Sequence, residues 1–249
     1  GENPLKCEVR TDIGRSRKNN QDSFVLVTNG NDDVLGVVCD GVGGAAHGEV
    51  ASQTAVQWMK QQFEQAGSFL DLEDAKAWLY TSVVDTNDVV YKMAAANTTL
   101  SGMGTTLVAV LITKFGTIIA NAGDSRAYGM DGNGIFRVIT TDHTYVGNLV
   151  STGQISLQEA MNHPKRNVIV NAVGLWKKIE VDLFTVNDNT EKILLCSDGL
   201  HVYVYEEDIR AVLMTDSTTA RKTDVLVDKA NEAGGYDNVT VLLIEKTGR

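Results

Sequence analysis

Short apolar runs recur along the chain, separated by turn signals. Two examples are "VLGVVC" (34–39) and "TTLVAVLIT" (105–113), and their β-branched and aliphatic content predicts buried strands. Asn29-Gly30 and Asp131-Gly132 stand between neighbouring runs, and such short turns join antiparallel strands. The other predicted strands are 23–28, 117–122, 136–140, 178–186, 192–196 and 238–245.

Four longer segments carry apolar residues at helical spacing. The predicted helices are about 49–66, from about 71 onward, about 207–214 and about 218–233. In the first, Ala51 and Ala55 share a face with Phe63, and Gly234-Gly235 ends the last. Trp58, Trp78 and Phe63 are assigned to the core. Blocks of strands with helices in pairs predict the α+β class, with stacked antiparallel sheets covered by helices.

The composition is that of a globular protein with an acidic balance. The chain has 249 residues, of which 43% are hydrophobic and 22% charged, and 22 Lys and Arg against 32 Asp and Glu give a net charge of −10. This balance argues against partners such as nucleic acid or an anionic membrane, and the longest apolar stretch, 107–112, is too short to span a bilayer. We find no linker or repeat, so we expect a single domain over 1–249, and a monomer.

Three cysteines, Cys7, Cys39 and Cys196, are widely spaced. An odd number at such spacing argues against a disulfide framework. Cys39 and Cys196 lie inside apolar runs, where a buried, reduced thiol is expected. No signal-peptide pattern is visible at the start of the sequence. These features together favour a reducing, cytoplasmic location.

A carboxylate and several glycines follow the predicted strand 34–39. Asp40 is followed by Gly41, Gly43 and Gly44. Two explanations stand: Asp-Gly is a common hairpin turn, or the backbone comes close to a ligand that the carboxylate also holds. Like charges gathered at one end of a sheet repel one another unless cations hold them. Four more aspartates flank predicted strands: Asp22, Asp124, Asp198 and Asp237.

Carboxylates and glycine-freed carbonyls suit magnesium or manganese. Zinc is disfavoured because no His or Cys pair has ligand spacing. Two ions bridged by one carboxylate would activate a water for attack on phosphorus. Arg17, five residues before Asp22, could then hold the phosphate by two parallel hydrogen bonds. We assign surface or local hydrogen-bonding roles to the four histidines: His47, His143, His163 and His201.

Two other phosphate chemistries do not match the sequence. A cysteine phosphatase needs Cys, five residues and then Arg, but that place holds Ala45 after Cys39 and Val202 after Cys196. No P-loop motif is present, and "SGMGTT" (101–106) lacks the lysine that such a loop requires. We assign the small residues of "SGMGTT" to close packing at a strand start.

Eight motifs follow one another along the chain: "RKNNQDS", "DGVGG…GEVAS", "SGMGTTL", "NAGDSRAY", "TTDHTYV", "HPKRNVIVNAVG", "CSDGL" and "GGYDNVTV". In this order they resemble the metal-dependent Ser/Thr protein phosphatases (the PPM, or type 2C, family), above all its single-domain bacterial branch. The resemblance extends from about residue 12 to about 245. It implies a four-layer αββα sandwich, in which two antiparallel sheets are flanked by pairs of helices. It also implies hydrolysis of phosphoserine and phosphothreonine on proteins by a metal-activated water, opposing a Ser/Thr kinase.

The resemblance implies a binuclear manganese or magnesium centre (Mn2+ or Mg2+, two per chain) in a cleft at one edge of the sandwich. Asp40 would bridge the two metals, and the carbonyl of Gly41 would bind one of them. Asp198 and Asp237 would bind the other. Asp124, together with Asp198, matches a weaker third-metal site of the family.

Two further roles and one segment come from the same resemblance. Asp22 would orient metal-bound water, and Arg17 would grip the substrate phosphate as a catalytic and substrate-binding residue. The segment from about 146 to 166 corresponds to a flap beside the cleft. In it, Ser156 and Glu159 form a candidate capping box for a short helix.

The chain departs from the family pattern at two positions. Some members have a histidine two residues after the bridging aspartate, proposed to protonate the leaving alcohol, whereas this chain has Val42. A metal-bound water and His47 are then equal candidates for that acid. Many members have a carboxylate or amide four residues after Asp198, whereas this chain has Val202, which predicts weaker occupancy of the third site. The alternative function is a phosphatase-fold binding or regulatory module with weak or lost catalysis.

Overall fold

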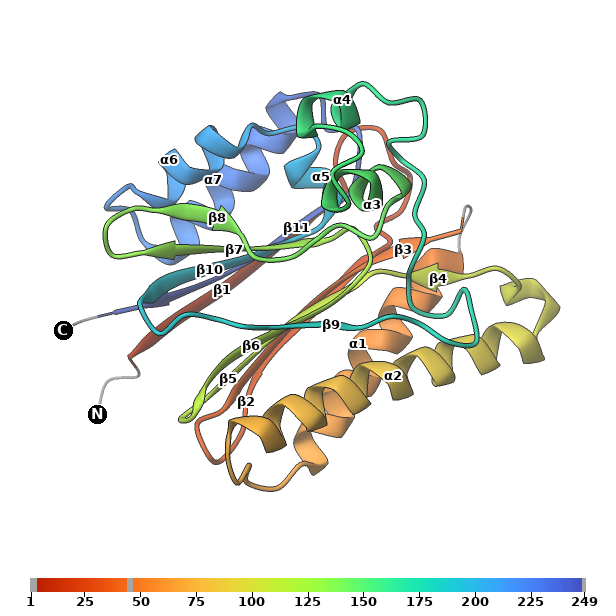
Figure 1. The fold of residues 1–249 in the computed structure, drawn as a ribbon, viewed down its shortest axis with the longest axis horizontal. Coiled ribbons are helices and arrows are strands. Elements are labelled where there is room, and N and C mark those ends of the chain that lie inside the picture. The colour runs from red at the N-terminus through yellow and green to blue at the C-terminus, as the bar shows by residue number, and fades with distance from the viewer. Residues whose placement is uncertain (1–3, 44–46, 248–249) are drawn as a thin grey trace.

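The computed structural model describes residues 4–43 and 47–247, and these form two antiparallel sheets packed face to face (Figure 1). The first sheet contains, in order, β1 (Leu5–Asp12), β11 (Val239–Lys246), β10 (Thr190–Cys196), β7 (Arg126–Asp131) and β8 (Phe136–Val138). The second contains β2 (Asp22–Thr28), β3 (Val34–Val42), β5 (Leu107–Thr113), β6 (Gly116–Ala122) and β9 (Asp182–Thr185), with β4 (Gly104–Thr105) paired to β3. All of these strand pairs are antiparallel, which confirms the prediction from the short turns.

Two long helices cover the outer face of each sheet (Figure 1). The second sheet carries α1 (His47–Gln65) and α2 (Leu72–Ala96), and the first carries α6 (Glu206–Leu213) and α7 (Thr219–Glu232). Shorter helices are η1 (Thr98–Leu100), α3 (Tyr145–Ser151), α4 (Leu157–Met161) and α5 (Asp198–His201). The predicted α+β class and its αββα layering are confirmed.

Apolar side chains fill the space between each pair of layers. Because successive side chains of a strand point to opposite faces, β3 contributes to two clusters: Val37 packs toward α1 and α2, whereas Val38 packs toward the other sheet. On the first sheet, Leu194 and Leu243 pack with Leu226 of α7. These layers fix the strand ends, and with them the loops that carry the aspartates.

The four long helices agree with the predicted boundaries to within two residues. Asp71 caps α2 by accepting a hydrogen bond from Asp74 N at 2.7 Å, and Thr218 caps α7 by accepting one from Arg221 N at 3.1 Å. Such caps satisfy backbone donors that the first helical turn leaves free.

Strand prediction was less complete than helix prediction. The predicted set omitted β1, a sheet edge whose exposed Lys6 and Glu8 give it no continuous apolar run, and β7. The predicted strand 178–186 was too long, since β9 covers only Asp182–Thr185. At Glu180 the backbone N–H and C=O both bond to the side chain of Asn171 (3.0 and 2.8 Å) rather than to a strand.

The core aromatics were predicted correctly in two cases of three. Phe63 is fully buried, and Trp78 packs on it edge to face at 5.9 Å between ring centroids. Trp58 is a correction: it is only partly buried and lies outside the apolar clusters of the described residues, because its place on α1 is at the margin of the face that Ala55 and Met59 bury.

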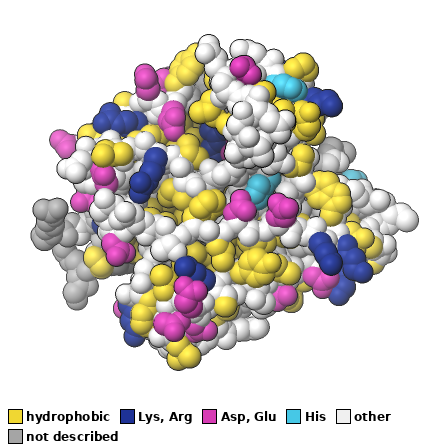
Figure 2. Space-filling model, in the orientation of Figure 1, with side chains coloured by type: hydrophobic (Ala, Val, Ile, Leu, Met, Phe, Trp, Pro, Cys, Tyr) yellow, Lys and Arg dark blue, Asp and Glu magenta, His cyan; other side chains and the backbone are white. Residues whose placement is uncertain are grey.

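The described residues also bear on the thiols and the surface. Cys39 and Cys196 are buried free thiols and Cys7 is a half-buried one, as predicted. No helix in ranges 4–43 and 47–247 is long and apolar enough to cross a bilayer. On the face shown in Figure 2, Lys and Arg side chains are interspersed with Asp and Glu rather than gathered into a basic stripe.

Candidate active site

The five predicted aspartates lie where the ends of the two sheets meet. Asp22 on β2 is the register partner of Asp40 on β3. Asp198 begins α5 directly after β10, Asp124 follows β6, and Asp237 precedes β11. The negative charge of Asp198 acts on each of the other four carboxyls. The fold thus brings together, from both sheets, carboxylates that are far apart in the sequence.

Asp40 is fixed through its backbone. Its N–H donates to Thr106 Oγ1 at 2.9 Å, and its carbonyl accepts from Thr106 N at 2.9 Å. Thr106 lies between β4 and β5, where β3 changes partner from one to the other. The Asp40 residue is only 9% exposed. Thr106 was missed as a positioning residue, although it belongs to the "SGMGTT" motif.

The glycines after Asp40 have a packing explanation. A Cβ at Gly41 would lie 2.2 Å from the carbonyl oxygen of Gly48 at the start of α1. Gly43 has φ +105°, and its Cβ would lie 2.4 Å from the carbonyl oxygen of Gly102. Close approach of another backbone therefore requires these glycines. From the sequence, close backbone approach to a ligand was one explanation. In the structure the neighbouring groups are backbone atoms of α1 and of the "SGMGTT" segment. Gly44 lies outside the described residues.

Asp22 has one oxygen held and one unpaired. Oδ2 accepts hydrogen bonds from Ser197 Oγ and Thr240 Oγ1, both at 2.8 Å. Oδ1 is buried and has no hydrogen-bond partner among the described residues. Ser197 directly follows β10 and Thr240 lies in β11, both of the first sheet, whereas Asp22 lies in the second, so these bonds join the two sheets at the site.

Asp198 and Asp237 form the solvent side of the cluster. Asp198 Oδ1 is buried without a hydrogen-bond partner among the described residues. Asp237 Oδ1 accepts from Asn238 N at 2.8 Å and pairs with Arg17 Nε at 3.3 Å. Arg17 is 58% exposed, so its guanidinium lies beside the carboxylates and still faces solvent.

Asn238 was missed by sequence reasoning, although it directly follows Asp237. Its Oδ1 accepts from Gln21 N at 2.9 Å, and its Nδ2 donates to the carbonyls of Ile13 and Asn19 at 2.9 and 3.0 Å. One amide thereby fastens the segment that carries Arg17 to the loop that carries Asp237.

Burial and mutual repulsion raise the pKa values of four of the aspartates. Burial, followed by the charge of Asp198, raises the pKa of Asp22 to about 7 despite its hydrogen bonds, and that of Asp237 to about 6. Burial and the charge of Asp198 also hold the pKa values of Asp40 and Asp124 well above the usual range. The charge of Asp22 adds to this effect at Asp40, and the charge of Asp142 adds to it at Asp124. Gathering these carboxylates is costly unless positive charge accompanies them.

The donor set fits hard divalent cations. Among the described residues, no three or more His, Cys, Asp or Glu side chains are arranged to enclose an ion by themselves. The aspartates instead form neighbouring pairs around Asp198. Magnesium keeps several waters and uses one or two carboxylates per ion, so paired carboxylates with unpaired oxygens match its needs.

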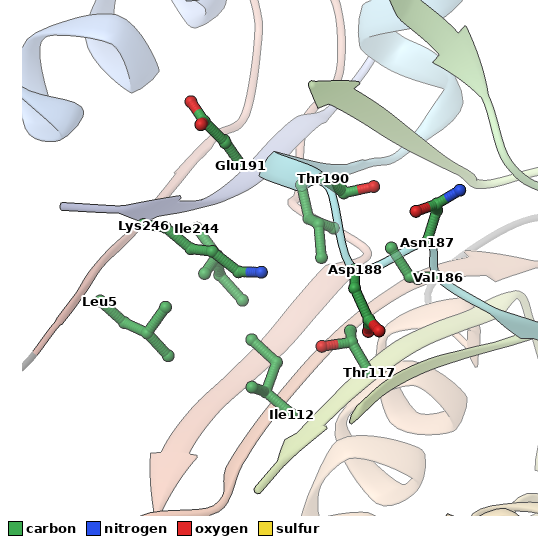
Figure 3. Close-up of a pocket in the computed structure, with 11 residues that line it drawn as sticks. Leu5, Ile112, Thr117, Val186, Asn187, Asp188, Thr190, Glu191, Ile244 and Lys246 are labelled. Atoms are coloured by element: carbon green, nitrogen blue, oxygen red, sulfur yellow. The ribbon is translucent and has the colours of Figure 1, made fainter. Parts of the chain in front are cut away.

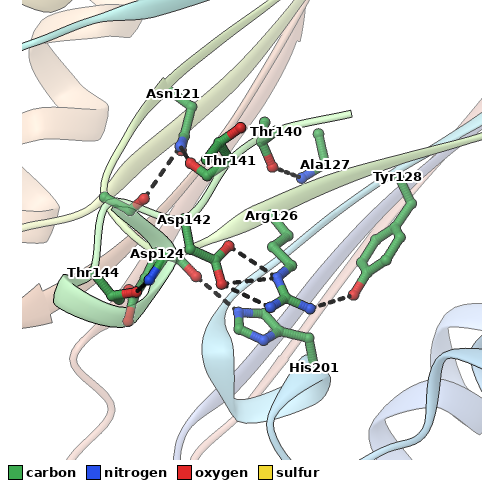
Figure 4. A network of polar contacts seen from close by, with 12 residues as sticks. Asn121, Asp124, Arg126, Ala127, Tyr128, Thr140, Thr141, Asp142, Thr144 and His201 are labelled. Atoms are coloured by element: carbon green, nitrogen blue, oxygen red, sulfur yellow. Dashed lines mark hydrogen bonds and ion pairs between the residues drawn. The ribbon is translucent and has the colours of Figure 1, made fainter. Parts of the chain in front are cut away.

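A second polar network supports Asp124 (Figure 4). His201 Nε2 lies 2.8 Å from the carbonyl oxygen of Asp124. Beside it, Arg126 donates from Nε and Nη2 to both oxygens of Asp142 at 2.7–3.2 Å, and from Nη1 to Tyr128 Oη at 3.3 Å. The carbonyl of Asp124 is therefore held from α5, the same helix that Asp198 begins.

Val202 directly follows α5 and is 56% exposed. It is therefore not a core residue beneath the strand end. The position four residues after Asp198 carries an exposed apolar side chain in place of a carboxylate or amide.

The segment 146–166 contains most of α3 and all of α4, which pack against each other. Thr144 caps α3 by accepting from Gly147 N at 3.0 Å. Ser156 caps α4 by accepting from Glu159 N at 3.1 Å, which confirms that half of the predicted capping box. His143, just before α3, is buried and lies 2.7 Å from Asp182 Oδ2, a local hydrogen-bonding role of the kind predicted.

A small cavity lies away from the aspartates (Figure 3). It opens between Leu5, Ile112 and Ile244, and Asp188 and Glu191 stand at its rim. Asp188 and Glu191 lie at the start of β10, whereas Asp198 follows the end of that strand. The cavity has room for about 20 Å³, close to a single water, so it is not a substrate site.

Several known proteins are similar to this chain over nearly its whole length. A family model described as protein phosphatase 2C matches residues 13–243. The chain is 40% identical over 243 residues to "Serine/threonine phosphatase stp" of Listeria monocytogenes, covering 97% of this chain and 96% of that protein. It is 32% identical over 246 residues to "Protein phosphatase PhpP" of Streptococcus pneumoniae, covering 96% and 97%. The crystal structure of serine/threonine phosphatase Stp1 from Staphylococcus aureus superposes with a TM-score of 0.91 and 37% identity, over 98% of this chain and 96% of that one.

Proposed function

Since the chain belongs to the protein phosphatase 2C family and is a metal-dependent Ser/Thr protein phosphatase, we propose that three of its aspartates hold two divalent cations. Asp40 would contribute to holding both ions, the Gly41 carbonyl would hold one of them, and Asp198 and Asp237 would hold the other. Manganese or magnesium (Mn2+ or Mg2+) would suit these ligands, and Asp124 with Asp198 would form a weaker third site.

The observation that carries this proposal is the pair of buried, unpartnered oxygens, Asp22 Oδ1 and Asp198 Oδ1. A buried carboxylate oxygen without a donor costs on the order of 1–3 kcal/mol or more. Raised pKa values at the neighbouring aspartates have the same origin. Divalent cations would remove both costs, because one would bind Asp198, a water held in the cleft would donate to Asp22 Oδ1, and the positive charge would offset the repulsion.

The chemistry divides between the ions and the protein. Bound divalent cations supply Lewis acidity and lower the pKa of a coordinated water so that it attacks phosphorus. Asp22, fixed at Oδ2 by Ser197 and Thr240, orients the attacking water through Oδ1. The leaving alcohol takes its proton from a water in the cleft or from His47 at the start of α1.

Arg17 binds the substrate phosphate. Its guanidinium offers donors in a planar fork that matches two phosphate oxygens. Its Nε lies 3.3 Å from Asp237 Oδ1, and the side chain is 58% exposed, so a phosphorylated side chain can approach it from solvent. Asp237 thereby couples the phosphate-binding arginine to the metal centre.

The wider setting follows from this activity. The enzyme acts on phosphorylated proteins as a monomer, opposes a Ser/Thr protein kinase and works in the cytoplasm, where its three free cysteines stay reduced. Residues 146–166 form a flap subdomain, built on α3 and α4, that lies beside the cleft.

The test compares two aspartate-to-asparagine variants with the wild-type enzyme. Asp237→Asn removes a proposed ligand, whereas Asp188→Asn makes the same change at an exposed aspartate at the other end of β10. We expect manganese-dependent hydrolysis of a phosphothreonine peptide by the wild type and by Asp188→Asn. For Asp237→Asn we expect weaker manganese binding by calorimetry and at least a tenfold lower kcat/KM. Equal manganese binding in all three proteins would reject this ligand set.

A further inference from the structure

A pair of tyrosines, Tyr236 exposed and Tyr203 half-buried, adjoins the Arg17–Asp237 contact. Tyr236 immediately precedes Asp237 and is 57% exposed. Its ring packs on that of Tyr203, at the end of the α5 segment, with centroids 5.7 Å apart and planes at 43°. Single exposed aromatics are common on protein surfaces, but two that contact each other beside a catalytic group form an apolar surface in a functional place.

The fold holds the Tyr236 ring in place. Gly234 has φ +130°, and a Cβ there would lie 2.1 Å from Tyr236 Cε2 and 2.5 Å from Cζ. The ring therefore lies directly on the Gly234 backbone, in space that any side chain would occupy. Tyr203 supports the ring from another side. A ring held in this way presents a fixed surface and loses little side-chain entropy when a ligand packs on it.

The same loop is tied to the segment that carries Arg17. The carbonyl of Gly235 accepts hydrogen bonds from Arg15 N at 2.7 Å and from Ser16 N at 3.1 Å. Asp237, on the other side of Tyr236, contacts Arg17 directly. Tyr236 thus lies between two attachment points of the Arg17 segment, so the tyrosine and the guanidinium keep a constant relation.

We propose that Tyr236, supported by Tyr203, binds an apolar side chain close in sequence to the phosphorylated residue of the substrate, so that the enzyme selects phosphoproteins by this neighbour. This inference rests on the proposed role of Arg17 in binding phosphate. An extended peptide advances about 3.3–3.6 Å per residue, so a residue within three positions of the phosphorylated one reaches the ring while Arg17 holds the phosphate. Leucine, isoleucine, proline and aromatic side chains have the chemistry that packs on a tyrosine face.

The experiment uses a set of phosphothreonine peptides in a serine and alanine background, each with one leucine at a position from three before to three after the phosphothreonine. We expect the wild type to show about a threefold to tenfold higher kcat/KM when leucine occupies one of these positions, the range for an apolar contact that is only partly buried. In Tyr236→Ala this ratio should fall to about one, and in Tyr236→Phe, which keeps the ring, it should persist.

Controls separate this inference from the proposed function. Tyr80→Ala removes another surface tyrosine of comparable exposure, 45% on α2. This variant should keep both the leucine preference and the activity of the wild type. If Tyr236→Ala hydrolyses none of the peptides, Tyr203→Ala is tested in its place. The ratio of kcat/KM with leucine to kcat/KM without it should fall in this variant too. p-Nitrophenyl phosphate has no flanking residues. Its manganese-dependent hydrolysis by the wild type therefore reports on the metal centre alone.

Three outcomes would overturn the selection surface while the phosphatase assignment stands. One is a wild-type enzyme that hydrolyses all peptides equally. Another is a preference that survives Tyr236→Ala. The third is a change of molar mass in light scattering for Tyr236→Ala with an unchanged ratio, because the tyrosines would then be a contact between two copies of the chain. A wild type inactive on p-nitrophenyl phosphate would instead reject the proposed function.

Discussion

Replacing Asp198 by asparagine should stabilise the metal-free protein and destabilise the metal-loaded one. Asp198 contributes to the raised pKa values of four neighbours, Asp22, Asp40, Asp124 and Asp237. Asparagine keeps the shape, removes the charge and adds an amide donor near carboxyl oxygens that lack one. The change therefore relieves repulsion in the absence of cations and removes a ligand in their presence.

The magnitude follows from the charges. Two unit charges about 4 Å apart interact by about 4 kcal/mol at an effective dielectric constant of 20. Much of this is avoided in the wild type, because carboxyls with raised pKa values stay partly protonated at neutral pH. We expect a net gain of about 1–2 kcal/mol without metal, which corresponds to a melting temperature higher by roughly 2–8 °C in a domain of this size.

Cations reverse the order. At a free manganese concentration of about 1,000 Kd, binding stabilises the wild type by about 4.1 kcal/mol, and a 100-fold weaker site in Asp198→Asn limits the gain to about 1.4 kcal/mol. The difference of about 2.7 kcal/mol exceeds the gain from relieved repulsion. Turnover on a phosphothreonine peptide should fall at least tenfold, a loss of about 1.4 kcal/mol or more in transition-state stabilisation.

The pH dependence has a definite sign. The pKa of Asp22 is raised to about 7 in the folded protein, so its carboxyl holds a proton after the unfolded chain has lost its own. The contribution of Asp22 to stability without metal is then fully present below about pH 4 and is lost as the pH rises through about 7. In Asp198→Asn the loss should be smaller over the same interval.

The assay is thermal unfolding of both proteins, in EDTA and in manganese, from pH 4 to 8. Asp188→Asn, an exposed aspartate far from the site, serves as the control for the chemical change. If Asp198→Asn melts below the wild type in EDTA at pH 7.5, repulsion does not dominate and the electrostatic reasoning is wrong. If manganese raises both melting temperatures equally, Asp198 is not a ligand.

Three further changes test separate parts of the structure. Arg17→Ala should raise KM for phosphopeptides about tenfold, and Arg17→Lys should restore it only in part because the fork is lost; steady-state kinetics showing no change in either variant would leave Arg17 as an ordinary surface charge. Val202→Asp should fold normally, since the side chain is 56% exposed, and should move the weak phase of a manganese titration to lower concentration; an unchanged titration would show that this position does not face the third site. Burial raises the pKa of Glu245, but hydrogen bonds from Lys192 and Lys222 outweigh it and hold the pKa below its usual value, so its stabilisation is present above about pH 4.5 and is lost as the pH falls through the folded pKa. Glu245→Gln should cost about 2–4 kcal/mol in urea unfolding at pH 7, because Lys222, only 4% exposed, loses its carboxylate, and a cost below about 0.5 kcal/mol would contradict this.

The helices were the most predictable part of the fold because their signals are local. Asp71 and Thr218 are capping residues that stand directly before apolar residues at helical spacing, and Gly234 ends α7 with a left-handed φ of +130°. In contrast, β1 is recognisable only through its partner β11, which buries one side of its alternating residues. Strand pairing is a long-range property, so an edge strand with alternating charges carries little signal of its own.

The aspartates of the site could be predicted because each lies within two residues of a strand end, and four of the five have glycine or asparagine next to them in the sequence. Their supporting residues could not, because support comes from across the sandwich. Asp22 on β2 depends on Ser197 after β10 and on Thr240 in β11, and no spacing in the sequence relates these three. Each hydroxyl does, however, lie within three residues of a predicted aspartate that flanks a strand of the first sheet.

This adjacency has a structural reason. Ser197 donates to Asp22 and directly precedes Asp198, so any shift of β10 along β11 would move the proposed ligand Asp198 together with the residue that supports Asp22. Thr240 is linked in the same way to Asp237, three residues before it, and its N–H donates to Ser197 Oγ at 3.0 Å. The carboxylates of the two sheets are therefore held at a fixed separation by a chain of hydroxyls rather than by flexible loops. Since a binuclear centre needs its ions roughly 3.5–4 Å apart, a rigid link between the sheets would allow carboxylates from both sheets to hold the proposed pair of ions.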